Sequence, residues 1–267
     1  MLKTIKQLLL GATIALTLIG GAQAGETLQR IIDFKTLKVG MSADQPPMTT
    51  LNRQGGVMGL DVDLARGLAR AMRVQLDIKV LPFGDLLTAL EKGEIDLVMS
   101  NMSITPERSE KAYFAGPYMM TGKSILTRSS VLAQVESTGA INRADLKIAA
   151  IANSTSATFA QENTPEAELT TTATSDEAVA LLIAGKVDAV LADMAVCKLA
   201  VLRNPESGLV TLKKALTLEP VGIAIKGDDP QLQNLIDNFI DAFGKTGVLG
   251  QLRKKWFEDG DWVAALP

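Results

Sequence analysis

The pattern of apolar and polar positions divides most of the chain into alternating strands and helices. Apolar residues alternate with polar ones over 74–80, which predicts a half-exposed strand. Over 60–72 the apolar residues recur at helical spacing, which predicts a helix with one buried face. Further strands are predicted at 36–41, 124–127, 147–151 and 221–225, and further helices at 232–243 and 248–257. This alternation predicts an α/β protein with largely parallel sheets.

One helix–glycine–strand pattern occurs twice, and its two copies end in opposite charges. The copies cover 86–101 and 178–193, and in each a glycine follows the helix as a C-cap. The first strand leads to 103–108, which carries a cation, whereas the second ends at the anion Asp193. Two similar lobes with one charge of opposite sign each would form a cleft suited to a small zwitterion.

Length and composition fit a protein of two lobes. The chain has 267 residues, enough for two compact units, and 47% hydrophobic with 21% charged residues is ordinary for a soluble protein. Aromatic residues make up only 4%, and the net charge is −3 without a basic run. We therefore expect no nucleic-acid partner.

The N-terminus has the pattern of a secretory signal peptide. Two lysines precede an apolar run over 8–19, and Ala22-Gln23-Ala24 supplies the small-x-small cleavage pattern. The run is too short for a typical transmembrane helix. We expect residues 1–24 to be removed and the mature chain to begin at about Gly25.

The sequence has no histidine and a single cysteine, Cys197. Histidine-based catalysis and histidine metal sites are therefore excluded, and no internal disulfide can form. Cys197 lies in an apolar stretch and is expected to be a small buried residue rather than a nucleophile.

Asp61 and Asp63 fall in the first turn of a predicted helix and are expected to be helix-start acids. We expect neither a metal nor a cofactor.

Polar residues gather directly after predicted strands, where α/β sheets bind ligands. These segments are 42–48, 101–108, 153–156 and 192–193. Within them Arg108 can bind a carboxylate through two parallel hydrogen bonds, and Ser103 can add further donors. The alternative is that Arg108 pairs with Glu107 or Glu110 on a solvated helix face.

Asp193 ends an apolar strand, where a carboxylate is poorly solvated unless it meets a cation. A ligand ammonium group would satisfy it. The alternative is that Asp193 caps the following helix, and the two roles can coexist. Asp96 and Asp188 precede the strand cores in both copies and are expected to serve the fold.

Two further segments are candidates for ligand contacts. Ser154, Thr155 and Ser156 can offer hydroxyl and amide donors from the second lobe, although a plain polar loop would look the same. The Phe83 ring can pack on the apolar part of a ligand, and the ordinary alternative is a hydrophobic staple at the helix start.

Six segments in the same order resemble the family-3 periplasmic solute-binding proteins, which include histidine-, glutamine- and lysine/arginine/ornithine-binding proteins. The segments are 59–65, 103–108, 114–118, 187–193, 222–226 and 255–257. The resemblance covers nearly all of 36–258. It implies a type II periplasmic-binding-protein fold, in which two α/β lobes joined by two hinge strands enclose the ligand. Lobe 1 would comprise 25–120 plus 222–267, and lobe 2 would comprise 121–221.

The resemblance also implies roles for single residues. Arg108 would bind the ligand carboxylate with help from Ser103 and Thr155, and Asp193 would bind the α-ammonium group. Phe83 would pack over the ligand, and Asn101 would contribute its backbone carbonyl. Ser156 lies beside Thr155 in the same loop.

The expected side-chain pocket departs from the family pattern. Many relatives carry an aromatic residue where this chain has Gln45, and the usual phenylalanine is Met48. Ser42 stands where relatives selective for basic or amide side chains often have an acid. Asp44 and Gln45 indicate a polar ligand side chain.

These features predict a monomeric periplasmic binding protein that captures an amino acid and delivers it to a membrane ABC permease, and not an enzyme. One alternative is a secreted enzyme similar to cyclohexadienyl or arogenate dehydratases, with Asp193 or Asp44 as the general acid. Another is a sensory ligand-binding protein.

Overall fold

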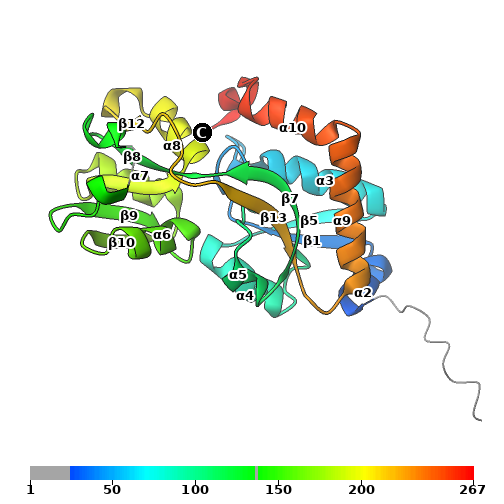
Figure 1. Cartoon of the computed structure of the whole chain (residues 1–267). Coiled ribbons are helices and arrows are strands. Elements are labelled where there is room, and N and C mark those ends of the chain that lie inside the picture. The colour runs from blue at the N-terminus through cyan, green and yellow to red at the C-terminus, as the bar shows by residue number, and fades with distance from the viewer. Residues whose placement is uncertain (1–24, 136–137) are drawn as a thin grey trace, which may run out of the picture.

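The computed structural model describes residues 25–135 and 138–267, so the predicted signal peptide lies outside the described residues. Two lobes lie side by side, and each contains a five-stranded sheet flanked by helices (Figure 1). The strand order is β5-β1-β6-β13-β7 in lobe 1 and β10-β9-β11-β8-β12 in lobe 2. This arrangement confirms the predicted two-lobed α/β class.

The strands that the sequence predicted fall close to their predicted bounds, and the structure adds strands at 113–121, 168–172 and 210–211 that were not predicted. Lobe 1 contains β1 (Thr36–Met41), β5 (Gln75–Val80), β6 (Leu97–Val98), β7 (Tyr113–Thr121) and β13 (Glu219–Ile225). Lobe 2 contains β8 (Lys123–Thr127), β9 (Lys147–Ile151), β10 (Glu168–Thr172), β11 (Ala189–Asp193) and β12 (Val210–Thr211). A small third sheet follows β1 and is built from β2 (Asp44–Gln45), β3 (Thr49–Leu51) and β4 (Val57–Met58).

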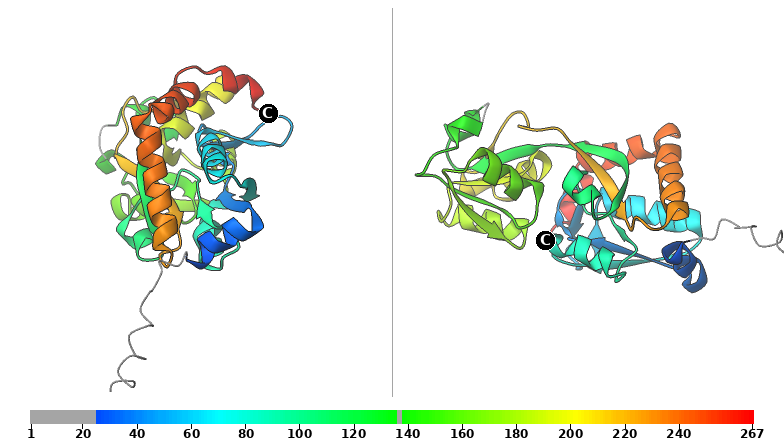
Figure 2. Two further views of the ribbon diagram at one scale, coloured as in Figure 1. Left: turned by 90° about the vertical axis from the view of Figure 1, so that its right-hand side faces the viewer. Right: turned by 60° about the horizontal axis from the view of Figure 1, so that its bottom comes forward.

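Helices cover the sheets of both lobes (Figure 2). Those of lobe 1 are α2 (Glu26–Phe34), α3 (Leu60–Met72), α4 (Leu86–Glu91), α5 (Pro106–Ser109), α9 (Pro230–Lys245) and α10 (Val248–Phe257). Those of lobe 2 are α6 (Thr155–Asn163), α7 (Ser175–Ile183) and α8 (Met194–Arg203). In the part of the chain that the structure describes, none of the helices has the length and apolar character needed to span a membrane.

Each sheet is largely parallel, as expected, because four of its five strands run in one direction and one strand runs antiparallel to them. In lobe 1, β1 pairs in parallel with β5 and β6, but β13 is antiparallel to both β6 and β7. Lobe 2 repeats this arrangement, with β9 parallel to its neighbours and β8 antiparallel to β11 and β12. Helical crossovers produce the parallel pairs, whereas the antiparallel ones involve the strands that run between the lobes.

Two chain segments join the lobes and support each other (Figure 1). The chain crosses from β7 to β8 through Gly122 and returns into β13. The Lys123 backbone N–H donates to Thr217 Oγ1 at 2.9 Å, and the Leu216 N–H donates to the Lys123 carbonyl at 2.7 Å. A Cβ on Gly122 would lie only 2.1 Å from the Thr217 carbonyl oxygen, so this close approach requires glycine.

The repeated helix–glycine–strand pattern builds corresponding parts of the two lobes. Gly93 and Gly185 follow α4 and α7 with φ of 73° and 68°, as the C-cap prediction requires. Asp96 Oδ2 accepts from the Lys38 N–H at 2.7 Å, and Asp188 Oδ2 accepts from the Lys147 N–H at 2.8 Å. Each acid ties its strand to a neighbouring strand, which confirms that both serve the fold.

Asp61 is a buried acid that connects α3 to the edge of the lobe 1 sheet. Its side chain accepts from Tyr118 Oη at 2.7 Å and from the Asn101 N–H at 2.8 Å. Asn101 has a left-handed backbone with φ of 52°, which the bond from Asp61 helps to hold. Burial raises the pKa of Asp61 to about 7, although both hydrogen bonds favour its charged form.

Because its folded pKa is raised, Asp61 should make the protein less stable as the pH rises. Between about pH 4 and pH 7 the folded state keeps a proton that the unfolded chain has lost, so the free energy of unfolding falls with pH. Asp61→Asn cannot ionise. Between pH 5 and pH 8, urea unfolding should show that the free energy of unfolding falls by at least about 1 kcal/mol more in the parent than in this variant. A difference that stays the same at both pH values contradicts this assignment.

Candidate functional site

The carboxyl ends of strands from both lobes converge on one small cavity between them. It has a volume of about 30 Å³. The predicted site residues that line it are Gln45, Phe83, Asn101, Ser103, Arg108, Thr155, Ser156 and Asp193. Lys123 and Ser175 also line it, although the sequence did not point to either.

Arg108 is buried and contacts both lobes. Its side chain is held among backbone carbonyls, with Nη1 donating to Ser103 O at 3.0 Å and Nη2 donating to Asn153 O at 3.1 Å. The guanidinium carbon lies 5.5 Å from the centre of the Phe83 ring, a cation–π distance. Thr105 Oγ1 accepts from the Arg108 N–H at 3.2 Å and fixes this turn of chain. Arg108 therefore faces the cavity instead of pairing with its neighbouring glutamates on the surface.

Asp193 uses both carboxylate oxygens inside the cavity. Oδ1 accepts from Lys123 Nζ at 2.6 Å, and Oδ2 accepts from Asn101 Nδ2 at 2.5 Å. The second of these bonds crosses between the lobes. Asp193 occupies the N-cap position of α8, as the alternative expected, but its side chain makes no capping bond to that helix in the described structure.

Lys123 and Glu219 are the charged residues of the site that sequence reasoning missed. Lys123 is only 2% exposed, and its Nζ lies 3.1 Å from Glu219 Oε2. The same oxygen accepts from Ser103 Oγ of lobe 1 at 2.8 Å and from Thr155 Oγ1 of lobe 2 at 2.9 Å. A lysine two residues before the apolar Ile125 and Leu126 was the available signal, but the sequence does not show which strands meet.

The four charged groups of the site balance one another. Two cations, Arg108 and Lys123, face two anions, Asp193 and Glu219. Burial by itself would raise the pKa of Glu219, but the Lys123 ammonium and the hydrogen bonds from hydroxyl groups outweigh burial and lower it. Burial also lowers the pKa of Arg108, while the Glu219 carboxylate opposes that shift. Glu219 is therefore held as an anion and is poorly placed to donate a proton.

The remaining predicted residues position their neighbours. Ser154 caps α6, because its Oγ accepts from the Ala157 N–H at 3.2 Å. Ser156 is buried in the first turn of the same helix. Gln45 Oε1 accepts from Asn101 Nδ2 at 3.0 Å, so Asn101 contributes its side-chain amide to this site, whereas the expected role of its backbone carbonyl stays a prediction.

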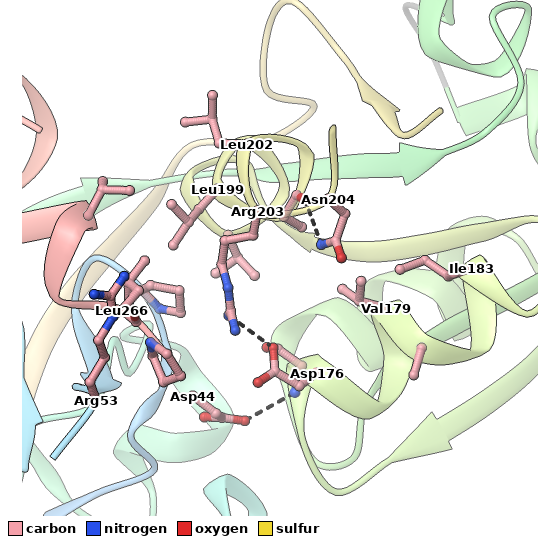
Figure 3. Close-up of a pocket in the computed structure, with 17 residues that line it drawn as sticks. Asp44, Arg53, Asp176, Val179, Ile183, Leu199, Leu202, Arg203, Asn204 and Leu266 are labelled. Atoms are coloured by element: carbon pink, nitrogen blue, oxygen red, sulfur yellow. Dashed lines mark hydrogen bonds and ion pairs between the residues drawn. The ribbon is translucent and has the colours of Figure 1, made fainter. Parts of the chain in front are cut away.

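Asp44 does not line the small cavity, and its predicted role as a ligand-binding residue stays a prediction. Its Oδ2 accepts from the Ser175 N–H at 3.1 Å, at the start of α7 in the opposite lobe. Asp44 instead lines a second cavity of about 440 Å³ between the lobes (Figure 3). The two cavities are neighbours, because Ser175 lines both.

Cys197 is buried, as expected. Burial raises the pKa of its thiol to about 12, so it is not a thiolate nucleophile at neutral pH. Within residues 25–135 and 138–267, no group of three or more Cys, Asp or Glu side chains is arranged to hold a metal ion.

Comparison with known proteins places the chain in a family. Residues 37–259 match the model of the bacterial extracellular solute-binding proteins, family 3, and the chain belongs to that family. The chain is 28% identical to "ABC transporter arginine-binding protein 1" of Escherichia coli, covering 95% of this chain and 99% of the relative. It is also 25% identical to the cyclohexadienyl dehydratase of Pseudomonas aeruginosa, covering 92% of each.

Solved structures agree with this placement. The ancestral amino acid-binding protein AncCDT-1, described as a precursor of cyclohexadienyl dehydratase, superposes with a TM-score of 0.79 at 33% identity. That match covers 87% of this chain and 100% of the other. A binding component of an ABC transporter from Wolinella succinogenes, complexed with lysine, has a TM-score of 0.80 at 30% identity and covers 86% and 99%.

Lys123→Met should destabilise the protein, because it leaves the Asp193 carboxylate buried without its cation. We expect a loss of about 3–5 kcal/mol in the free energy of unfolding, measured by urea denaturation. Adding Asp193→Asn should recover part of that loss. Lys255→Met is the matched control, because Lys255 pairs with Asp63 at the same 2.6 Å but is about half exposed, and it should cost under about 1 kcal/mol. Equal losses for the two lysines would contradict the interpretation.

Proposed function

We propose that this chain is the substrate-binding protein of an ABC transporter and that its ligand is an amino acid. The observation that carries the proposal is the meeting of Arg108 of lobe 1 and Asp193 of lobe 2 at one buried cavity. Family membership and the names of the relatives support it. The protein would act in the periplasm as a monomer, with residues 1–24 as its signal peptide.

The two charged groups would hold the backbone of the ligand. The ligand carboxylate would accept hydrogen bonds from the Arg108 N–H groups that donate to Ser103 O and Asn153 O in this structure. The α-ammonium group would donate to Asp193 in place of Lys123, which keeps Glu219 as its partner. Each new bond replaces an existing one, so the net binding energy is smaller than the sum of its contacts. A micromolar dissociation constant, about 8 kcal/mol, is reasonable for such an exchange.

Binding would be coupled to movement of the lobes. A cavity of about 30 Å³ has room for only about one or two water molecules, so a ligand can enter only when the lobes part. Four hydrogen bonds would form or break with that movement, between Arg108 and Asn153, Asn101 and Asp193, Thr155 and Glu219, and Ser175 and Asp44. The ABC permease would then recognise the closed form.

Arg108→Ala should weaken binding of every α-amino acid that the parent binds. Calorimetry should show a loss of at least about 2–3 kcal/mol, because the ligand carboxylate would be buried without its counter-charge. Arg66→Ala is the control, because Arg66 pairs with Asp63 on the exposed side of α3. Affinity within threefold of the parent would show that Arg108 does not bind the carboxylate.

The second candidate function is a dehydratase. It is favoured by the relative from Pseudomonas aeruginosa and by Asp44, because burial raises the pKa of that carboxyl and so makes it a better proton donor. The Glu219 anion and Asp193, which accepts hydrogen bonds at both oxygens, do not suit that role.

Incubation of the purified protein with prephenate or arogenate separates the two functions. We expect no aromatic product by absorbance, because the charged groups of the small cavity are engaged with one another. Formation of product that Asp44→Asn abolishes would establish the enzyme and displace the binding function.

A further inference from the structure

Two buried oxygen atoms face each other's lobe without a hydrogen-bond partner. They are Asp44 Oδ1 of lobe 1 and Ser175 Oγ of lobe 2, and neither has a partner among the described residues. Ser175 is only 5% exposed. A third such atom, Thr49 Oγ1, lies within lobe 1. A buried polar atom without a partner destabilises the fold, so the pair at the interface calls for an explanation.

These two atoms lie where a ligand side chain would leave the small cavity. Ser175 lines that cavity together with Arg108 and Asp193, and it also lines the larger cavity beside Asp44. Figure 3 shows the Asp44 carboxylate reaching from lobe 1 to the start of α7, where it meets the backbone of lobe 2. A ligand with its backbone at Arg108 would therefore send its side chain past Ser175 toward Asp44.

The other charged groups around the larger cavity already have partners. Arg203 Nη1 donates to Asp176 at 3.4 Å, and Arg53 Nε donates to the Leu266 carbonyl at 2.8 Å. Burial raises the pKa of the Asp44 carboxyl, and the Ser42 hydroxyl opposes that shift. Ser42 forms no hydrogen bond to Oδ1 in the described structure, and its hydroxyl bonds Ser100 Oγ at 3.0 Å. Asp44 Oδ1 is thus the charged oxygen that still needs a donor.

The charge balance of the site adds to this argument. Arg108, Lys123, Asp193 and Glu219 compensate one another, and the zwitterionic backbone of an amino acid would add one charge of each sign. The Asp44 carboxyl accepts a hydrogen bond from the Ser175 N–H and has no counter-ion within salt-bridge distance in the described structure. A cation at this point would satisfy the oxygen and compensate its charge at once.

We propose that the ligand is an amino acid whose side chain ends in a protonated nitrogen, and that this group donates to Asp44 Oδ1 and Ser175 Oγ. The inference rests on the proposed function, because it takes the ligand backbone to lie at Arg108 and Asp193. The side-chain contact joins residues of opposite lobes, so a cationic ligand stabilises the closed form at two points instead of one.

Calorimetry with arginine, lysine, glutamine and glutamate tests the proposal. The parent should bind arginine or lysine at least tenfold more tightly than glutamine or glutamate. Asp44→Asn retains an acceptor for the Ser175 N–H but removes the charge. Its affinity for the cationic ligand should therefore fall at least tenfold, whereas its affinity for glutamine should stay within threefold of that of the parent. Ser175→Ala should weaken only the cationic ligand, by a few fold. Asp176→Asn, the adjacent exposed carboxyl, should bind as the parent does.

The possible results separate this inference from the function on which it rests. Preference of the parent for glutamine or glutamate overturns the inference, and so does an equal loss for all four ligands in Asp44→Asn. Binding of neutral amino acids would then leave the proposed function intact. If none of the twenty amino acids binds the parent, the proposed function itself fails. Thermal unfolding of each variant shows that it is folded, and Ser175→Ala gives a second, milder test of the same contact.

Discussion

A buried lysine between two carboxylates is the constraint on which the arrangement of the lobes depends. Lys123 enters the interior where the chain first crosses between the lobes, and it meets Asp193 at the end of β11 and Glu219 at the start of β13. A buried charge without a counter-charge is costly, so these groups have to stay together while the lobes are closed. Glu219 also accepts a hydrogen bond from a hydroxyl group of each lobe. The connection between the lobes and the candidate ligand site are therefore one polar network, and anything that binds there must rearrange it.

The two lobes share a scaffold and differ in what they present to the cavity. In each, a helix, a glycine and a strand bring a polar group to the edge of a sheet, and an aspartate ties that strand to its neighbour. The same backbone geometry ends at Asn101 in one lobe and at Asp193 in the other, and these two side chains hydrogen-bond across the interface. The repeat places the groups, and the positions at which its two copies differ set the chemistry.

The same electrostatic balance bears on the choice between a binding protein and an enzyme. A carboxylate that accepts from a lysine and a hydroxyl, as Glu219 does, suits the role of counter-ion and resists protonation. Asp44 is different, because it is half-buried at the rim and one of its oxygens is buried without a hydrogen-bond partner in the described structure. The relatives include both binding proteins and a dehydratase, so the surroundings of a few carboxyl groups matter more than the shared fold.

Local sequence was sufficient to predict those features that depend on neighbouring residues. The bounds of β1, α3 and α10, the glycine C-caps and the grouping of Arg108 with Asp193 follow from periodicity and from the rule that sites lie beyond the ends of strands. The sequence could not predict the antiparallel strand in each five-stranded sheet, the burial of Lys123 or its contact with Glu219, because these depend on strands that meet only when the chain crosses twice between lobes. Nor could it show that lobe packing turns the Asp44 carboxylate to α7. Local patterns determined which residues lie at the strand ends, and the tertiary structure decided which of their charges face one another.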